Sequence, residues 1–114
     1  MITKAWEEKE EFKVRVQEWA KKLDVQAQTV SVRPMKNKWA SCSTNGRLNF
    51  NDELLKLDRK VGDYVIVHEL LHFNVPNHGK LWKSLMHLHL GDYEKLERRL
   101  PKIDLRRADL QKCI

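Results

Sequence analysis

The sequence predicts a single α+β domain over residues 1–114, in which a small antiparallel sheet packs on a central helix, with further N- and C-terminal helices. Three observations lead to this prediction. A chain of 114 residues is long enough to bury one hydrophobic core and too short for two. Hydrophobic residues near the N-terminus recur at helical spacing. An Asn45-Gly46 pair between two short extended runs indicates a hairpin.

The first expected element is an amphipathic helix over roughly residues 4–23. Its hydrophobic residues recur at intervals of three and four between charged positions, which places them on one face. They are Trp6, Phe12, Val16, Trp19, Ala20 and Leu23. A strand should follow over residues 29–35, where valines alternate with polar residues. Pro34 favours the edge of the sheet for this strand, because proline donates no ladder hydrogen bond.

The predicted hairpin covers residues 38–51 and turns at its Asn-Gly pair, since both residue types tolerate positive φ. Asn51 or Asp52 can cap a short helix that ends near Leu57. After a Gly-Asp pair, the apolar run that contains HELLH predicts the central helix over residues 63–74.

Pro76 should end the central helix, because proline lacks the amide hydrogen and disfavours helical geometry in the residue before it. Further helices are expected over residues 79–90 and 92–100, separated by Gly91. Residues 103–114 are weakly patterned, and we expect them to form a docking or mobile tail.

The net charge of +6, from 22 basic and 16 acidic residues, suits acidic proteins, nucleic acid or an anionic membrane surface, and equally suits solubility alone. No apolar run is long enough to span a membrane, and the N-terminus lacks the apolar stretch of a signal peptide. We therefore expect a cytoplasmic protein without a membrane partner. Cys42 and Cys113 do not have the spacing of a zinc knuckle or a disulfide framework.

Two histidines and a glutamate interrupt the apolar central helix. His68 and His72 are one turn apart on the same face, so both can direct a ring nitrogen at one ion. Glu69 projects about 100° away around the helix axis, where it can reach a water molecule at that ion without being a ligand. Burying a carboxylate beside two imidazoles costs several kcal/mol unless something compensates, and a divalent cation would do so.

The alternative is that HELLH arose by chance and that its histidines make hydrogen bonds in a core. His78 favours the metal site, because the chain can leave the helix after Pro76 and bring a third imidazole back to the ion. Three histidines with an open fourth position usually hold a catalytic zinc, whereas structural zinc has four protein ligands. His87 and His89 follow on divergent faces of the next helix, and we expect them to be surface or packing residues.

These residues predict hydrolysis of peptide bonds. A bound Zn²⁺ would polarise the scissile carbonyl and activate a water molecule, while Glu69 takes the proton and passes it to the leaving amine. A tetrahedral oxyanion would need a further donor, for which Tyr93, His87, His89 and a nearby arginine are unranked candidates.

Two longer stretches resemble the YgjP-like and SprT-like (WLM) metallopeptidase families. They are KWASCSTNGRLNFNDELL and DYVIVHELLHFNVPNHGKLW. These stretches are similar to the W-G-S-C hairpin, the H-E-x-x-H helix and the N-H-[GS]-x-x-[FW] segment of those families. The resemblance covers residues 35–100 and extends to the minigluzincins, which are stand-alone peptidases of similar size. It implies a zincin-like fold and a zinc-dependent endopeptidase that acts on protein or peptide substrates.

Position by position, the resemblance implies zinc ligands at His68, His72 and His78 and a catalytic glutamate at Glu69. Trp82 would help to pin the segment of His78 into the core. The resemblance also implies that an edge strand of the sheet pairs with an extended peptide through backbone groups, which requires no particular substrate side chain. Either strand of the hairpin is eligible for that pairing.

Some residues depart from the patterns of the related families. Ala40 stands where the YgjP-like and SprT-like families usually have glycine, which should change only local packing. The spacing of the last two histidines also matches metzincins, but Val75 occupies the place of their glycine and resists the same turn. In gluzincins the third ligand is a glutamate on a later helix, so Glu94 or Glu97 remains an alternative to His78.

Two other functions stay open. One is an inactive or latent metalloprotease scaffold, in which the C-terminal segment covers the cleft and Cys113 takes the open zinc position, although a frayed tail is simpler. The other is a SprT-like protease that acts on DNA-associated proteins, which fits the basic charge. The intact Glu69 disfavours an inactive scaffold, and the lack of a separate basic, aromatic-rich segment disfavours autonomous DNA recognition.

Overall fold

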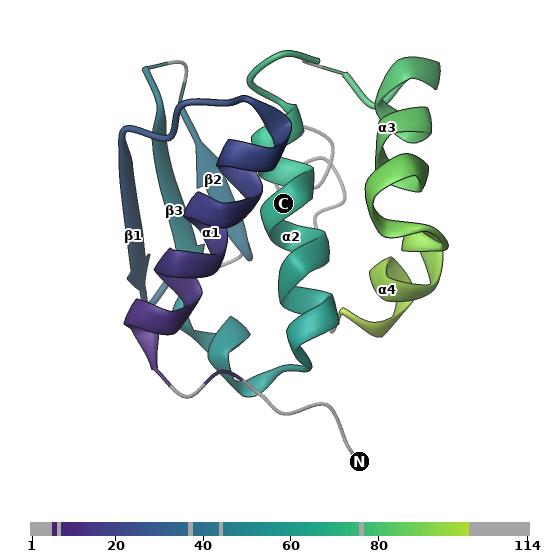
Figure 1. Ribbon diagram of the computed structural model, residues 1–114. Coiled ribbons are helices and arrows are strands. Elements are labelled where there is room, and N and C mark those ends of the chain that lie inside the picture. Colours follow the sequence, from purple (N-terminus) through teal and green to yellow (C-terminus); the bar gives the residue numbers. More distant parts are fainter. Residues whose placement is uncertain (1–5, 7, 37, 44, 76, 101–114) are drawn as a thin grey trace.

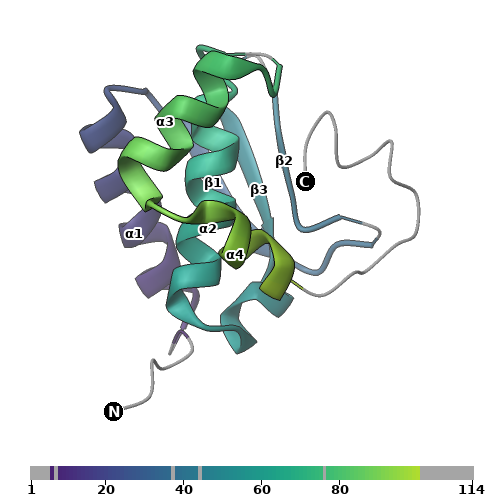
Figure 2. The ribbon, with the colours of Figure 1, turned by 90° about the vertical axis from the view of Figure 1, so that its right-hand side faces the viewer.

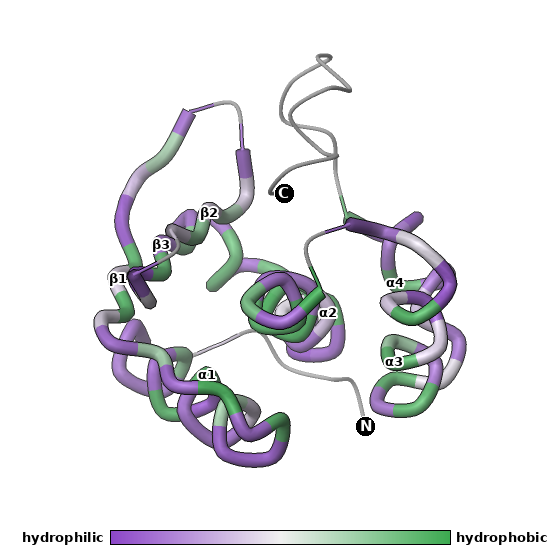
Figure 3. The backbone as a smooth tube through the Cα atoms, turned by 90° about the horizontal axis from the view of Figure 1, so that it is seen from above, coloured by the Kyte–Doolittle hydropathy of each residue, from purple (hydrophilic) through white to green (hydrophobic). Residues whose placement is uncertain are grey.

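The computed structural model describes residue 6 and residues 8–36, 38–43, 45–75 and 77–100. Its elements, in chain order, are α1 (Lys9–Leu23), β1 (Thr29–Arg33), β2 (Ala40–Cys42), β3 (Arg47–Asn51), a 3-10 helix η1 (Asp52–Lys56), α2 (Arg59–Leu71), α3 (Lys80–Leu90) and α4 (Tyr93–Arg99). Helix α2 lies in the middle, with α1 and the sheet on one side and α3 and α4 on the other (Figures 1 and 3). The predicted α+β class is confirmed, and the HELLH helix is its central element.

Helix α2 is central because its side chains are apolar nearly all round. Every residue from Tyr64 to Leu71 is buried. Val65, Ile66 and Val67 have no exposed surface. Because consecutive helical residues point about 100° apart, other parts of the protein cover the helix on three sides at this level. Each such aliphatic side chain contributes about 1.5–3 kcal/mol when it leaves water. Helices α3 and α4 cover the face of α2 that turns away from the sheet, as the side view shows (Figure 2).

The sheet is mixed, which corrects the expectation that all its pairings are antiparallel. Its strand order is β1-β3-β2. Strands β2 and β3 form the predicted antiparallel hairpin, and Gly46 takes the expected positive φ of 90° at its turn. Strand β1, however, pairs in parallel with β3, from Thr29 opposite Arg47 to Arg33 opposite Asn51. The predicted edge position of the strand that precedes Pro34 is confirmed.

Asn51 explains how the chain crosses from β1 to β2 past the end of β3. Its side chain is 1% exposed. The amide nitrogen donates to the carbonyls of Met35 and Lys38 at 3.0 and 3.1 Å. The amide oxygen accepts from the Glu53 N–H at 2.9 Å and so caps η1. One buried side chain therefore holds the crossing segment and starts the next helix, which places β3 between the other two strands.

The predicted boundaries of α2 were wrong at both ends. The helix begins at Arg59 rather than at residue 63, because the side chain of Asp58 accepts a hydrogen bond from the Lys60 N–H at 2.8 Å and caps it. It ends at Leu71 with His72 as its C-cap, before residue 74. The chain then turns, and the Val75 N–H bonds back to the Leu71 carbonyl at 2.8 Å.

Gly62 lies inside α2 rather than before it, because Trp6 packs against the helix at this point. A Cβ atom at Gly62 would lie 2.7 Å from Nε1 of Trp6. The glycine therefore permits a close approach of the indole. Trp6 itself precedes α1, which begins at Lys9 rather than at residue 4, since Glu8 is in the extended conformation.

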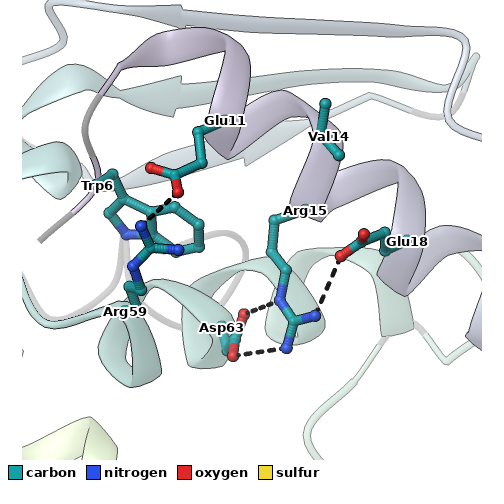
Figure 4. A pocket seen from close by; sticks show the side chains of 7 residues that line it. All are labelled: Trp6, Glu11, Val14, Arg15, Glu18, Arg59 and Asp63. Atoms are coloured by element: carbon teal, nitrogen blue, oxygen red, sulfur yellow. Dashed lines mark hydrogen bonds and ion pairs between the residues drawn. The ribbon is translucent and has the colours of Figure 1, made fainter. Parts of the chain in front are cut away.

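A group of ion pairs joins α1 to α2 on the face drawn in Figure 4. Nε and Nη2 of Arg15 donate to the two carboxylate oxygens of Asp63 at 2.8 and 3.0 Å. The Trp19 indole donates to the same carboxylate at 2.9 Å. Nearby, Arg59 pairs with Glu11 and lies over the Trp6 ring (Figure 4). These contacts set the rotation of α2 against α1 and thus the direction in which its histidines face.

The remaining elements agree with expectation. Strand β1 and helices α3 and α4 lie within their predicted ranges, and Gly91 separates α3 from α4 at a φ of 69°. Within the described residues, no helix is long and apolar enough to cross a membrane. The predicted tail, 103–114, and Cys113 lie outside the described part of the chain.

We predict that Asn51→Asp destabilises the protein by about 2–4 kcal/mol, because the carboxylate keeps the bond to Glu53 but cannot donate to the two carbonyls. Urea unfolding at neutral pH measures the loss. Asn49→Ala, on the same strand but at a half-exposed position, is the matched control and should cost less than about 1 kcal/mol. An Asn51→Asp midpoint equal to that of the wild type would contradict the role given to Asn51.

Candidate metal centre

Three histidines from two parts of the chain meet beside the C-terminal end of α2. His68 is 3% exposed, and its ring centroid lies 4.8 Å from that of His72, one turn later. The ring of His78, from the loop before α3, lies 4.9 and 4.7 Å from those two rings. One nitrogen from each ring can be chosen so that all three atoms lie within 4.8 Å of one another. This arrangement could hold a metal ion.

The tautomer of His72 follows from its hydrogen bonds. Nδ1 of His72 lies 3.1 Å from the Val75 carbonyl oxygen, which can only accept, so Nδ1 carries the proton. Its Nε2 therefore presents a lone pair, and this atom lies 2.9 Å from Nε2 of His78. A ligating histidine commonly donates its other ring N–H to a carbonyl in this way. The Val75 carbonyl thus orients the His72 ring so that its Nε2 faces the ring of His78.

The distances suit an ion with only a small adjustment. Two imidazole nitrogens on a tetrahedral zinc, each about 2.0–2.1 Å from it, are about 3.3 Å apart. The two Nε2 atoms of His72 and His78, at 2.9 Å, need to separate slightly. Nδ1 of His68 is buried and hydrogen-bonds to no group among the residues that the structure describes. The residues present therefore fit a metal ion, and imidazole donors suit zinc, copper, iron and nickel.

Glu69 brings a carboxylate to the same helix turn. Its side chain has no exposed surface, and Oε2 lies 3.5 Å from Nδ1 of His68. Glu69 does not belong to the group of three convergent side chains, which are all histidines. The structure thus places one buried carboxylate beside the three rings.

Trp82 packs against all three histidines. It lies in the first turn of α3 and is 4% exposed. Its ring centroid is 5.0, 6.1 and 4.5 Å from those of His68, His72 and His78. The indole therefore fills the side of the cluster formed by α3, which agrees with the expectation that Trp82 pins the segment of His78.

The electrostatics of the cluster favour the neutral form of two of its rings, those of His72 and His78. The pKa of His78 is lowered to about 4, first by burial and then by the neighbouring His68 and His72. Burial and the His68 ring also lower the pKa of His72 below its ordinary value. Both rings are thus neutral at neutral pH, which is the form that binds a metal ion.

The other candidates from the sequence lie outside the cluster. His89 packs edge-on against Trp19 of α1 at 6.2 Å, and His87 is exposed and contacts Tyr93 at 5.0 Å. Glu94 and Glu97 are exposed residues of α4 and are not among the convergent side chains.

Tyr64 is a neighbour of the site that the sequence analysis did not single out. Its ring lies 5.8 Å from His68, one turn earlier on the same face of α2. Burial raises the pKa of Tyr64, and so does the carboxylate of Glu97, to which its side chain hydrogen-bonds. The phenol therefore stays protonated and links α2 to α4 behind His68. The four-residue spacing between Tyr64 and His68 would have placed the two side chains on the same face of the helix from the sequence alone.

Two hollows on the surface differ in their relation to the histidines. A hollow of about 520 Å³ lies between α1 and α2, and its lining residues, drawn in Figure 4, are largely paired with one another. None of them belongs to the cluster. A second hollow, of about 610 Å³, is lined by His72, by Phe73 and by Cys42 and Ser43 at the end of β2. Of these two hollows, the second connects the hairpin to a histidine of the cluster.

Comparison with known families decides what kind of protein this is. The sequence profile of the YgjP-like metallopeptidase domain matches residues 3–103. The chain belongs to the YgjP-like metallopeptidase family. This membership confirms the resemblance seen in the hairpin and HELLH stretches, and it makes the protein a metallopeptidase whose substrates are proteins or peptides. No protein with a curated description matches the chain.

Solved structures agree with this assignment. The metallopeptidase zymogen jannalysin of Methanocaldococcus jannaschii is 26% identical and has a TM-score of 0.71, over 77% of this chain and 91% of that one. The metallopeptidase zymogen abylysin of Pyrococcus abyssi has a TM-score of 0.66 at 19% identity, over 90% of this chain and 99% of that one. The likeness to abylysin concerns the fold alone. This YgjP-like chain thus shares its architecture with small metallopeptidases.

We predict that divalent metal raises the melting temperature of this YgjP-like protein, because an ion that binds only the folded state stabilises it by mass action. Free zinc at a hundred times its dissociation constant should contribute about 2.7 kcal/mol, or roughly 10 °C for a domain of this size. His72→Ala should abolish the shift. His87→Ala, which changes an exposed histidine, should retain it. Differential scanning fluorimetry with and without chelator measures the shifts, and equal shifts in both variants would exclude the cluster as the site.

Proposed function

We propose that the protein is a zinc-dependent endopeptidase in which His68, His72 and His78 hold Zn²⁺ and Glu69 is the general base. The observation that carries the proposal is the convergence of three imidazoles within 4.8 Å beside a carboxylate that has no exposed surface. Three imidazole donors leave room for water or substrate at the ion, as in catalytic zinc sites. Bound zinc supplies Lewis-acid polarisation of the scissile carbonyl and lowers the pKa of water.

Glu69 performs the proton transfers in this proposal. Its carboxylate accepts a proton from the attacking water and then delivers it to the nitrogen of the departing amine. Its burial removes competing bulk water and strengthens its interactions with nearby charges. Its position one residue after His68 keeps it on the turn that carries the ligands, with Oε2 3.5 Å from Nδ1 of His68.

Strand β2 is the strand that would bind substrate. In the hairpin, the Asn51 N–H bonds to the Trp39 carbonyl and the Ser43 N–H to the Arg47 carbonyl. Because bonding alternates along an antiparallel pair, the backbone groups of Ala40 point away from β3. Strand β2 is also an edge of the sheet, and its Cys42 end adjoins the hollow that contains His72. An extended peptide paired with β2 would pass beside the histidines.

Backbone pairing supports cleavage inside a chain rather than at its ends. Pairing along β2 recognises the repeating N–H and C=O groups of an extended segment and requires neither a free amine nor a free carboxylate. The sheet edge thus selects extended conformation, and we infer that side-chain preference arises elsewhere in the cleft.

A latent state is the second candidate, because the similar structure of jannalysin, at 26% identity, is that of a metallopeptidase zymogen. Latency would leave the metal site intact while preventing access of substrate. It differs from the leading proposal only in whether the full chain cleaves a substrate that it is given.

The test compares the wild type with Glu69→Gln, which preserves the size of the side chain but removes the base. We expect at least a hundredfold loss of cleavage of casein and of a quenched peptide, with zinc still bound at one ion per chain. Zinc content is measured by mass spectrometry on the same samples. Zinc without cleavage by the wild type would favour latency, and no zinc in either protein would overturn the ligand set.

A second prediction concerns the binding mode. Replacing single amide hydrogens of a cleaved peptide by methyl groups should lower kcat/KM at least tenfold at alternate positions only, since successive N–H groups of a strand point to opposite sides. Kinetics on a series of N-methylated peptides measures this period of two. Losses of similar size at every position would argue against pairing with β2.

A further inference from the structure

The third histidine of the cluster is held differently from the other two. His68 and His72 are fixed by α2 and its C-cap, whereas His78 lies in the loop before α3. Its ring is half-buried and packs on Trp82 at 4.5 Å. A ring contact limits where the imidazole can go but does not set the backbone that carries it. The position of the third nitrogen therefore depends on what orders the loop.

Asn77 orders that part of the loop. Its side-chain oxygen Oδ1 accepts a hydrogen bond from the Gly79 N–H at 2.9 Å. This bond spans the residue between them, so it closes a tight turn with His78 at its centre. Asn77 is itself exposed, which makes packing a poor explanation for its side chain.

The lack of a side chain at Gly79 leaves room for the side-chain oxygen of Asn77. A Cβ atom at position 79 would lie 2.8 Å from Oδ1 of Asn77, too close for the observed turn. The Gly79 carbonyl accepts the first helical bond of α3, from the Lys83 N–H at 3.0 Å. Asn77 and Gly79 therefore act as a pair that joins the turn around His78 to the start of the helix that carries Trp82.

We propose that Asn77 is a positioning residue for the metal centre, whose turn with Gly79 holds the imidazole of His78 against the two imidazoles of α2. This inference rests on the proposed function, since it takes His78 as a ligand. In this role Asn77 would contact neither substrate nor ion. It acts by reducing the number of loop conformations that must be lost when His78 binds the ion, so its effect should appear in metal affinity.

A purely structural role in starting α3 makes a different prediction. In that case, loss of Asn77 would lower the stability of the metal-free protein and leave the intrinsic affinity for metal unchanged. The two roles are separated by measuring metal affinity and metal-free stability on the same variants.

The experiment uses the full chain and four single variants: Asn77→Ala, Asn77→Asp, His78→Ala and Asn74→Ala. Zinc affinity is measured by competition with a chromophoric chelator at pH 7.5, and the visible spectrum of the cobalt-substituted protein reports coordination geometry. Asn74→Ala changes an exposed asparagine in the same loop and is the matched control. Asn77→Asp retains an oxygen that can accept the Gly79 bond.

We expect Asn77→Ala to weaken zinc binding about 10- to 100-fold, the range typical of residues that orient ligands. It should also weaken the tetrahedral cobalt bands. Asn77→Asp should bind at least as tightly as the wild type, and Asn74→Ala should bind within about twofold of it. The metal-free melting temperature of Asn77→Ala should stay within a few degrees of the wild type.

The coupling with Gly79 gives an independent check. Gly79→Ala should displace Oδ1 of Asn77 and weaken zinc binding to a similar extent. The double variant Asn77→Ala/Gly79→Ala should bind zinc no more weakly than whichever single variant binds it less tightly, because both changes break the same turn.

Failure of this inference can be told apart from failure of the proposed function. If His78→Ala does not weaken zinc binding, then the ligand set is wrong. If His78→Ala weakens binding while Asn77→Ala binds within twofold of the wild type, then His78 is a ligand that Asn77 does not position. Equal weakening of zinc binding by Asn77→Ala and Asn77→Asp would also overturn the inference, because the oxygen retained in Asn77→Asp should preserve the bond to the Gly79 N–H and with it zinc affinity.

Discussion

The structure depends on the burial of one helix, α2, in the core. This helix carries a buried imidazole, His68, and a buried carboxylate, Glu69. Helix α2 is enclosed by α1 and the sheet on one side and by α3 and α4 on the other, so His68 and Glu69 are withdrawn from water with their aliphatic neighbours. Withdrawing an ionised carboxylate from water costs several kcal/mol that nearby positive charge or hydrogen bonds must offset, and a cation beside the three imidazoles would contribute to that offset. Fold and site are thus coupled, because the contacts that enclose α2 also bury its carboxylate beside the imidazoles.

The site is assembled from parts that differ in how firmly they are held. Two rings stand on α2, whose rotation is set by the pair of Arg15 with Asp63 on its opposite flank. The third ring comes from a loop, where local bonds replace helical ones. Trp82 then packs on all three rings from α3. Two of the three rings are therefore positioned by a helix and the third by a loop and its contact with Trp82.

The elements that sequence could predict are those governed by local chemistry. Helical periodicity, the Asn-Gly turn, the break at Gly91 and the spacing of the histidines all act within a few residues, and the structure bears them out. The parallel pairing of β1 with β3 could not be predicted in this way, because it depends on the bonds of Asn51 to residues that are distant in sequence. The role of the Val75 carbonyl was equally hidden, since every residue has a carbonyl and only the fold brings this one to His72. The start of α2 was predicted wrongly because Gly62 was interpreted as a break before the helix. The glycine instead makes room for Trp6, which belongs to another part of the chain.

Anomalous diffraction at the zinc absorption edge, from crystals of the zinc-loaded protein, tests the central claim most directly. We expect one strong peak between the three rings, with one nitrogen each of His68, His72 and His78 about 2.0–2.1 Å from it. A peak elsewhere, or no peak between these rings in fully loaded protein, would contradict it.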